Sequence, residues 1–192
     1  MKRRTFDRIV TFLGFGLAIL FLIGAALLNW GANFADQSVT DQLSNQNISF
    51  PAEAGMPEAT KAKLAKWANM QVTTGEMARD YSDLYIWEHM KAASVAALGK
   101  PYTYSEVSAQ YMGLVRGGST DQAQIQKLGD LRQTLFMGNT LRGMLLQAFA
   151  FWQLGLIAGY ASLALLVGGI VMLILSIAGL LHLRRTPEDA MI

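Results

Sequence analysis

The sequence predicts an all-α membrane protein: two transmembrane helices with a helical extracytoplasmic domain inserted between them. Two stretches carry no charged residue: twenty residues from Ile9 to Leu28 and thirty-nine residues from Gly143 to Leu181. The hydrocarbon core of a bilayer is about 30 Å thick, and a helix crosses it with about 20 apolar residues. The segment between the stretches contains ten Lys or Arg and eleven Asp or Glu residues, so we expect it outside the membrane.

Basic residues indicate the orientation of the two predicted spans. Four of them precede the first span, and Arg184 and Arg185 follow the second. Because basic residues next to membrane helices stay on the cytoplasmic side, both termini are expected in the cytoplasm and the chain in the plasma membrane. The expected segments are a cytoplasmic N-terminus, a first span, an extracytoplasmic domain, a second span and a cytoplasmic C-terminus, at residues 1–8, 9–30, 31–150, 151–181 and 182–192.

The first apolar stretch has a second interpretation, a cleaved signal peptide, because a basic start precedes it. The stretch is long for a signal peptide, and no Ala-x-Ala cleavage site follows Leu28, so we favour an uncleaved anchor. The sequence contains no cysteine, which leaves the outer domain without disulfides and without thiolate chemistry.

Start and stop signals predict a long helix over residues 74–98. Thr73 and Glu76 have the spacing of a capping box, in which each side chain accepts a hydrogen bond from a free backbone N–H group. Gly99 and Pro101 end this helix, because glycine adopts the left-handed conformation readily and proline cannot continue a helix. A shorter helix is expected before it, over residues 58–69.

Two more helices are predicted further along the chain. Thr103 and Glu106 repeat the capping-box spacing, and Ser119 or Thr120 is expected to cap the last helix. That last helix carries apolar residues in the three-four alternation of a coiled-coil seam. The seam consists of Leu128, Leu131, Leu135, Gly138, Leu145, Phe149, Trp152, Leu156 and Gly159. Because its uncharged stretch would be about 58 Å long as a helix, the second span is expected to begin as a stalk above the membrane.

The sequence carries no signature of catalysis, metal binding or nucleic-acid binding. His89 is the only histidine of the predicted outer domain, since His182 follows the second span. Zinc and iron need several ligands that converge on one point, so we expect His89 to pack against Tyr85, four residues earlier. No G-x-S-x-G elbow or glycine-rich phosphate loop occurs, and the outer domain is nearly neutral. We therefore expect no catalytic, cofactor-binding or metal-binding residue, no cofactor and no nucleic-acid partner.

Arg142 gives the most specific structural prediction of the sequence, because its charge needs a partner. It falls on the apolar seam, where a charge has to be paired or has to reach water. We favour an ion pair with a carboxylate of the 74–98 helix, for which Asp80, Asp83 and Glu88 are the candidates. If that pair is buried, losing Arg142 would cost roughly 3–5 kcal/mol. The alternative is recognition of an anionic lipid headgroup.

Gly155 and Gly159 form a G-x-x-x-G pattern in the second predicted span. Small residues let two helices approach closely in lipid, so this face is expected to contact the first span. Homodimerisation through the same face is the alternative.

Short motifs occur along most of the chain: Gln42-Leu43 followed by Ile48, the helix with His89, Gly99-Lys100-Pro101-Tyr102 with Glu106, and Leu141-Arg142. Together they resemble a small family of actinobacterial membrane proteins with two spans and unknown function. The resemblance implies a shared architecture in the cell envelope, with no assigned active site. Members are sometimes labelled aromatic ring-opening dioxygenases, whose chemistry uses two histidines and a carboxylate on one iron. The predicted topology places His89 and His182 on opposite sides of the bilayer, which argues against that activity here.

Two functions remain open from the sequence. The first is a non-enzymatic accessory or scaffold subunit, whose outer domain binds other membrane or envelope proteins or further copies of the chain. The second is a module of the cell envelope that binds a lipid or a small apolar ligand. Its expected ligand face consists of Tyr81, Tyr85, Trp87 and His89.

Overall fold

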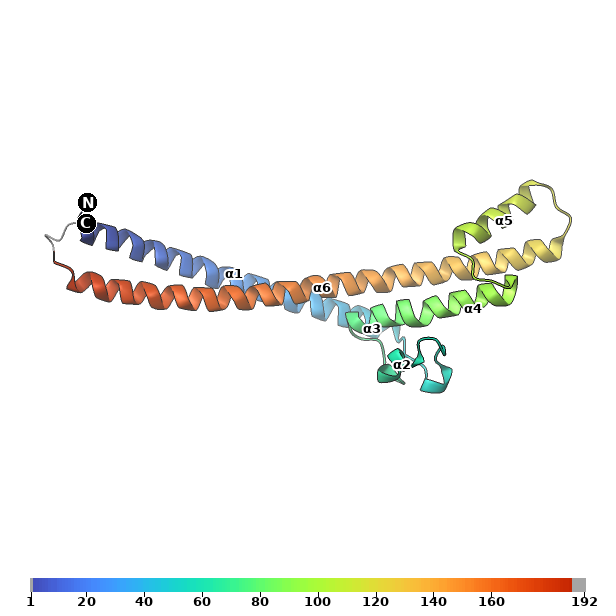
Figure 1. The fold of residues 1–192 in the computed structure, drawn as a ribbon, viewed down its shortest axis with the longest axis horizontal. Helices are drawn as coiled ribbons and strands as arrows, with labels where there is room; N and C mark the ends of the chain where they lie inside the picture. The colour runs from blue at the N-terminus through green and yellow to red at the C-terminus, as the bar shows by residue number, and fades with distance from the viewer. Residues whose placement is uncertain (1, 188–192) are drawn as a thin grey trace. The chain divides into compact units, whose positions relative to one another are not determined.

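A computed structural model describes residues 2–187, and its regular elements in this range are helices, apart from one isolated β-bridge (Figure 1). In chain order they are α1 (Arg3–Gln46), η1 (Glu53–Gly55), α2 (Lys61–Leu64), η2 (Ala65–Trp67), α3 (Gly75–Asp80), η3 (Tyr81–Ile86), α4 (Trp87–Leu98), α5 (Tyr104–Arg116) and α6 (Gln122–Arg185). The predicted all-α class is confirmed for these residues. Two helices, α1 and α6, are long and apolar enough to cross a membrane.

The chain divides into two compact units, and α1 and α6 contribute residues to both. Unit 1 comprises Met1–Asp36 and Leu154–Ile192, and unit 2 comprises Gln37–Gln153. Glu188 and Asp189, which belong to the predicted cytoplasmic C-terminus, lie outside the described residues.

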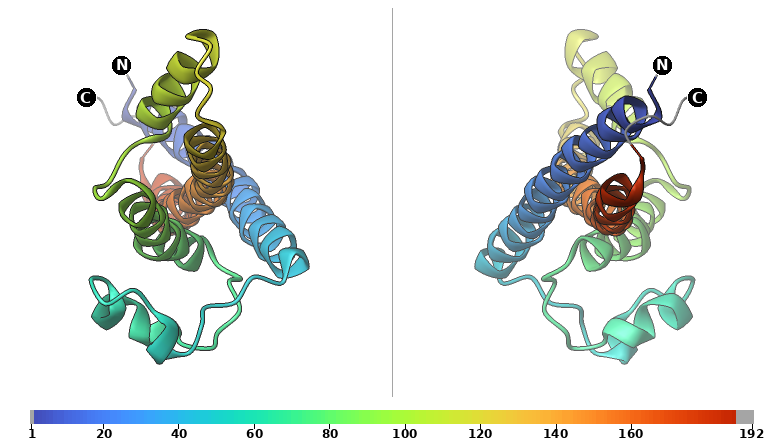
Figure 2. Two further views of the ribbon diagram at one scale, coloured as in Figure 1. Left: turned by 90° about the vertical axis from the view of Figure 1, so that its right-hand side faces the viewer. Right: turned by 90° about the vertical axis from the view of Figure 1, so that its left-hand side faces the viewer.

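In unit 1, α1 and α6 lie side by side (Figures 1 and 2). Small side chains form their contact. A Cβ atom on Gly155 would lie 2.9 Å from the Cβ of Ala35, so only glycine fits there. The Ser162 hydroxyl donates a 2.8 Å hydrogen bond across the contact to the carbonyl of Ala25. The buried residues of this contact include Thr11, Ala18, Ala25, Ala35, Ser162 and Ser176. Backbones can approach closely where such residues meet.

The large apolar side chains of unit 1 are on its outside. In the most apolar window of α1 only 22% of the residues are buried, and in that of α6 only 11%. The exposed ones include Phe12, Leu13, Ile19, Leu20, Ile23, Leu27, Ile157, Leu163, Val167, Ile170, Ile174 and Leu175. Helices in the core of a soluble protein have the opposite arrangement, because water drives large apolar side chains inward.

Unit 2 has two apolar cores, and the predicted seam of α6 contributes to both. The first core consists of Val39, Leu43, Phe50, Met56, Leu64, Val72, Met77, Ala78 and Leu145. The second consists of Met90, Val107, Leu128, Leu131 and Leu135. Helices α4 and α5 contact α6 at Gly138 and Gly129, where Met90 and Tyr111 lie close to the glycines.

The predicted helix over 74–98 is one helical run of three parts, α3, η3 and α4. Its middle part, η3, is a π-helical turn, which contains one residue more than an α-helical turn. Gly99 ends the run in the left-handed conformation, with φ of 80°. The sequence signals predict this stop, but they do not predict the π-helical turn.

Three helix starts differ from the sequence predictions. Thr74, not Thr73, caps α3, because its hydroxyl accepts a hydrogen bond from the N–H of Met77. Asp121, in place of Ser119 or Thr120, provides the carboxylate at the start of α6, bonded to the N–H of Gln124. The expected helix over 58–69 is reduced to the short elements α2 and η2.

Candidate functional site

A mainly apolar groove lies between α4, the 99–103 turn, the start of α5 and α6 in unit 2. Its volume is about 410 Å³, within the usual range for sites of small molecules. Its lining is mainly apolar and consists of Trp87, Met90, Lys91, Pro101, Tyr102, Thr103, Tyr104, Glu106, Leu135 and Asn139. Met90 and Leu135 belong to the second core, so the groove opens directly onto that core.

The turn after α4 holds Tyr102 in place. Gly99 reverses the chain, and the hydroxyl of Ser94, which is fully buried, then bonds to the turn twice. It donates to the carbonyl of Lys100 at 3.1 Å and accepts from the N–H of Tyr102 at 2.7 Å. The ammonium group of Lys100 also lies 4.9 Å from the centre of the Tyr102 ring. These contacts fix the backbone at Tyr102 and place a cation on one face of its ring.

Tyr104 is held from two directions. The capping box of Thr103 and Glu106 fixes the start of α5, where Tyr104 is the first residue. The guanidinium group of Arg132 donates to the Tyr104 hydroxyl at 3.4 Å, and the ring of Phe136 lies 5.9 Å from the tyrosine ring. Both partners come from α6, so the position of Tyr104 depends on the packing of α5 on α6.

Trp87, on the α4 side of the groove, is held by Arg142. The guanidinium carbon of Arg142 lies 4.6 Å from the centre of the indole ring. The same group donates to the carbonyl of Ser82 at 3.2 Å and to Oδ1 of Asp83 at 2.9 Å. Arg142 therefore joins α6 to the π-helical turn and orients the indole.

The charged residues at the groove are already paired or capped. Lys91 lies 2.7 Å from Oε1 of Glu88, so its charge is balanced inside α4. A hydrogen bond from the Thr103 N–H, with a second from its hydroxyl, holds the pKa of Glu106 below its ordinary value. Asn139 adds an exposed amide at the α6 edge. The groove thus offers an apolar floor and a polar edge without net charge.

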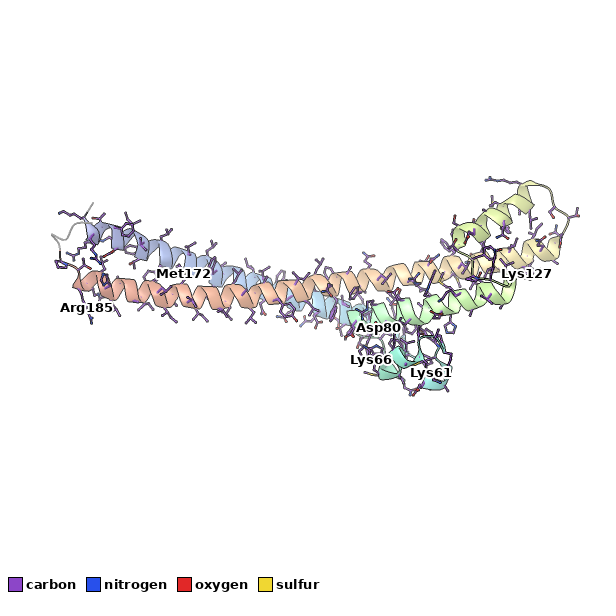
Figure 3. The ribbon with its side chains drawn as sticks, in the orientation of Figure 1. Lys61, Lys66, Asp80, Lys127, Met172 and Arg185 are labelled. Atoms are coloured by element: carbon purple, nitrogen blue, oxygen red, sulfur yellow. The ribbon has the colours of Figure 1, made fainter. Side chains whose placement is uncertain are left out.

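The three carboxylates proposed as partners of Arg142 have separate roles. Asp83 is the one that contacts Arg142. Glu88 pairs with Lys91, and Asp80 pairs with Lys66 and Arg79 (Figure 3). The contact of Arg142 with Asp83 is not a buried pair as expected, because the two side chains are 22% and 43% exposed. Water therefore reaches both charges.

Asp80 is the buried carboxylate of unit 2, with 5% of its surface exposed. Burial raises the pKa of its carboxyl group, but hydrogen bonds from Trp67 at 2.9 Å and from Arg79 at 2.8 Å lower it. With the nearby charge of Lys66, the lowering effects are larger, and the pKa lies below its ordinary value. Asp80 therefore joins η2 to α3. A more open hollow of about 540 Å³ lies beside it.

The four aromatic residues expected to form one ligand face do not do so. Tyr81, Tyr85 and His89 form a row at four-residue spacing, with ring centres 4.9 and 4.3 Å apart. Tyr81 also packs at 5.0 Å on Phe50, inside the first core. Trp87 comes two residues after Tyr85, so it points to another side of the helix and lines the groove instead.

The remaining candidate residues are explained by packing. His89 makes an edge-to-face contact with Tyr85, as its spacing predicts, and is otherwise exposed. Within residues 2–187, no three His, Asp or Glu side chains gather where they could hold a metal ion. Gly155 and Gly159 face Ala35 and Ala32 of α1, so the face proposed for homodimerisation is covered by the chain's own first helix.

Of the residues that line the groove, only Trp87 is predicted from the sequence as part of a ligand face. Local sequence does not predict the positions of Tyr102 and Tyr104 in the groove, because these depend on contacts with α6, which is distant in the chain. The available sequence signal was a stop motif, Gly99 with Pro101, followed directly by a start motif, Thr103 with Glu106. Together these motifs predict a tight turn between two helices, next to Tyr102 and Tyr104.

Comparisons with protein families, with curated proteins and with solved structures find no match to this chain. The resemblance to actinobacterial two-span proteins therefore stays a prediction.

Proposed function

We propose that this chain is a two-span membrane protein of the cell envelope whose outer helical unit binds a lipid or another small apolar ligand in the α4–α5–α6 groove. The observation that supports ligand binding is the groove itself, with its apolar floor and three held aromatic rings. A site whose walls are fixed in advance binds with a smaller loss of conformational entropy.

The chemistry of the groove suggests the class of ligand. Leu135 is 1% exposed and Met90 5%, so the floor suits an acyl chain or a fused ring. Of the charged residues that line the groove, Lys91 is balanced by Glu88, and Glu106 is held by Thr103. We therefore propose an amphipathic ligand whose polar end is uncharged or zwitterionic. The protein binds this ligand without transforming it.

Membrane anchoring is supported by unit 1. Its helices bury small residues and expose leucine, isoleucine and phenylalanine, which is favourable in lipid and unfavourable in water. Basic residues lie before the apolar part of α1 and at the end of α6, at Arg184 and Arg185. The proposed topology places both termini in the cytoplasm and unit 2 outside.

Thiol labelling tests this topology, because the natural chain has no cysteine. A single cysteine at Gly118, which lies in open space, should react in intact cells with a reagent that does not cross membranes. A cysteine at Thr5 should react only after the cells are opened. Labelling of the Thr5 variant in intact cells would refute the topology.

Fluorescence quenching tests the groove. Trp30 and Trp152 are replaced with phenylalanine, which leaves Trp67 and Trp87, and a Trp87→Phe version serves as the blank. A lysophosphatidylcholine with a brominated acyl chain is titrated into the protein in lipid nanodiscs. If the chain enters the groove, quenching should saturate and should disappear in the blank. Equal quenching with and without Trp87 would contradict the proposal.

A matched pair of variants sharpens the test. Asn139→Phe places a bulky ring at the edge of the groove, whereas Gln133→Phe adds the same ring elsewhere on the exposed surface of α6. We expect Asn139→Phe to weaken the saturable quenching at least tenfold and Gln133→Phe to leave it unchanged. Equal effects of the two rings would show that the brominated chain binds the surface without using the groove.

The second function proposed from the sequence is an accessory or scaffold subunit that binds other membrane or envelope proteins. The observation that favours it is an exposed apolar face on α6, separate from the groove. Its exposed side chains include Met137, Leu141 and Met144.

A further inference from the structure

One face of α6 within unit 2 exposes four large apolar side chains. Met137 is 52% exposed, Leu141 48%, Met144 61% and Phe151 41%. Ala148 lies between the last two and is partly buried against the first core. We call these five residues the outer stripe.

The spacing of the outer stripe is that of a coiled-coil seam. Its members follow one another at intervals of four, three, four and three residues, which keeps them on one side of an α-helix over two heptads. The seam predicted from sequence, with Leu128, Leu135 and Leu145, is a different one, and the chain's own helices cover it. The outer stripe is thus a second seam, which the chain's own first core covers at Ala148 and which is exposed at its four large side chains.

We infer that the outer stripe is the contact between two copies of this chain, which pair through their α6 helices in parallel. This inference rests on the proposed membrane anchoring, because two copies with the same topology must have α6 running in the same direction. In such a pair the twofold axis places each stripe residue opposite its own copy.

Charge supports a second copy as the occupant. In a symmetric pair, like charges beside the seam would face each other and repel. Between Gln133 and Gln153 the chain has one charged residue, Arg142, and that residue is paired with Asp83. The open flank of the stripe carries Thr140 and Gln147, which are uncharged. A basic or acidic partner would find no complementary charge there.

The size of the stripe indicates where the pair forms. The exposed parts of its side chains offer roughly 400 Å² per copy, below the roughly 800 Å² per partner of a stable interface in solution. Anchoring in one membrane with one orientation raises the effective concentration of the second copy. The contact should therefore form in membranes and dissociate when detergent dilutes the protein.

Cysteine crosslinking in native membranes tests the inference. Single cysteines are placed at Met137, Leu141, Met144 and Phe151, and membranes are oxidised with copper phenanthroline. A disulfide requires Cβ atoms about 4 Å apart, so it reports direct opposition of two copies. We expect disulfide-linked dimers at these four positions.

Two control positions lie on the same stretch of α6 but outside the stripe. Gly143 has open space around it, and Ala150 is exposed, so a cysteine fits at both. We expect dimer yields at least tenfold lower at these controls. A second variant, Leu141→Glu, puts two like charges on the axis and should lower the dimer yield of the Phe151 cysteine at least tenfold.

Several outcomes would overturn the inference: equal yields at stripe and control positions, no dimer at any stripe position, or a stripe disulfide to a different protein. That last result would support the scaffold hypothesis instead. The outcomes are independent of the ligand groove, because a failed quenching titration leaves the crosslinking pattern unchanged. They also differ from a failure of membrane anchoring, which the labelling of Thr5 and Gly118 cysteines reports separately.

Discussion

Replacing Arg142 with methionine tests how α6 is joined to the π-helical turn. The guanidinium group bonds to the carbonyl of Ser82 and to Asp83, and it lies over the ring of Trp87. Methionine keeps an apolar stem of similar reach but removes all three interactions. The variant therefore isolates the contribution of the charged end of the side chain.

The size of the effect follows from the exposure of the partners. Asp83 is 43% exposed, so its pair with Arg142 is worth up to about 1 kcal/mol. The bond to the Ser82 carbonyl adds about 1 kcal/mol, and the contact with the Trp87 ring adds about 0.5 kcal/mol. We expect a loss of about 2 kcal/mol. The roughly 3–5 kcal/mol of a buried pair does not apply, because water can reach Asp83 once Arg142 is gone.

Thermal unfolding of the full chain in mild detergent measures this loss. Near-ultraviolet circular dichroism is the suitable signal, since it follows the packed aromatic residues of unit 2, whereas helix content is dominated by α1 and α6. For a domain of this size, about 2 kcal/mol lowers the Tm by roughly 6–10 °C. In a double-mutant cycle, Arg142→Met and Asp83→Asn should couple by roughly 0.5–1 kcal/mol.

Two results would refute this reasoning. An unchanged Tm for Arg142→Met would mean that the three contacts add nothing to the stability of unit 2. A loss above roughly 4 kcal/mol, recovered when Asp83 is also made apolar, would mean that the pair is buried from water.

Three further predictions concern single sites. Asp80 has a lowered pKa in the folded chain, so its ionised form stabilises unit 2 above about pH 4. This contribution disappears as the pH falls through the folded pKa. In Asp80→Asn, the Tm should therefore fall less between about pH 5 and 2 than it does in the natural chain. The methyl group of Gly113→Ala would meet open space inside α5, so this variant should stabilise unit 2 by up to about 1 kcal/mol. In Gly75→Ala, the new Cβ would lie 2.5 Å from Trp152, so this variant should destabilise unit 2 by about 1–3 kcal/mol in the same melting assay. His89→Gln should leave the metal content of the purified protein unchanged by elemental analysis, and a stoichiometric metal lost in this variant would contradict the packing role.

Sequence motifs predicted the helix ends of unit 2 correctly where the residues of the motif themselves form the cap or the stop in the structure. Thr103 and Glu106 form the expected capping box, and Gly99 adopts the expected left-handed conformation. The capping box proposed for Thr73 and Glu76 failed because a tertiary contact competes for it. Glu76 bonds to Lys66 at 2.9 Å, and the neighbouring threonine takes over the cap.

The candidate site was less accessible to sequence reasoning. The apolar seam predicted that Arg142 needs a partner on the 74–98 helix, but three carboxylates were eligible. The choice depends on the rotation of the helix at each of them, which the π-helical turn changes. The groove depends on α4, α5 and α6 meeting at Tyr102, Tyr104 and Leu135. No local sequence pattern predicts contacts between segments that lie about thirty residues apart in the chain.

The π-helical turn also sets the rotational phase of α4. An α-helix turns by about 100° per residue, so one inserted residue rotates all that follows by that angle. Deleting one residue of η3, such as Leu84, would let the run continue as a plain α-helix and would turn Trp87 and Met90 away from α6. The positions before the turn, which serve the first core, would keep their phase. The two cores of unit 2 therefore tolerate no change in the length of the segment between them, and Ile86, in this segment, packs against both.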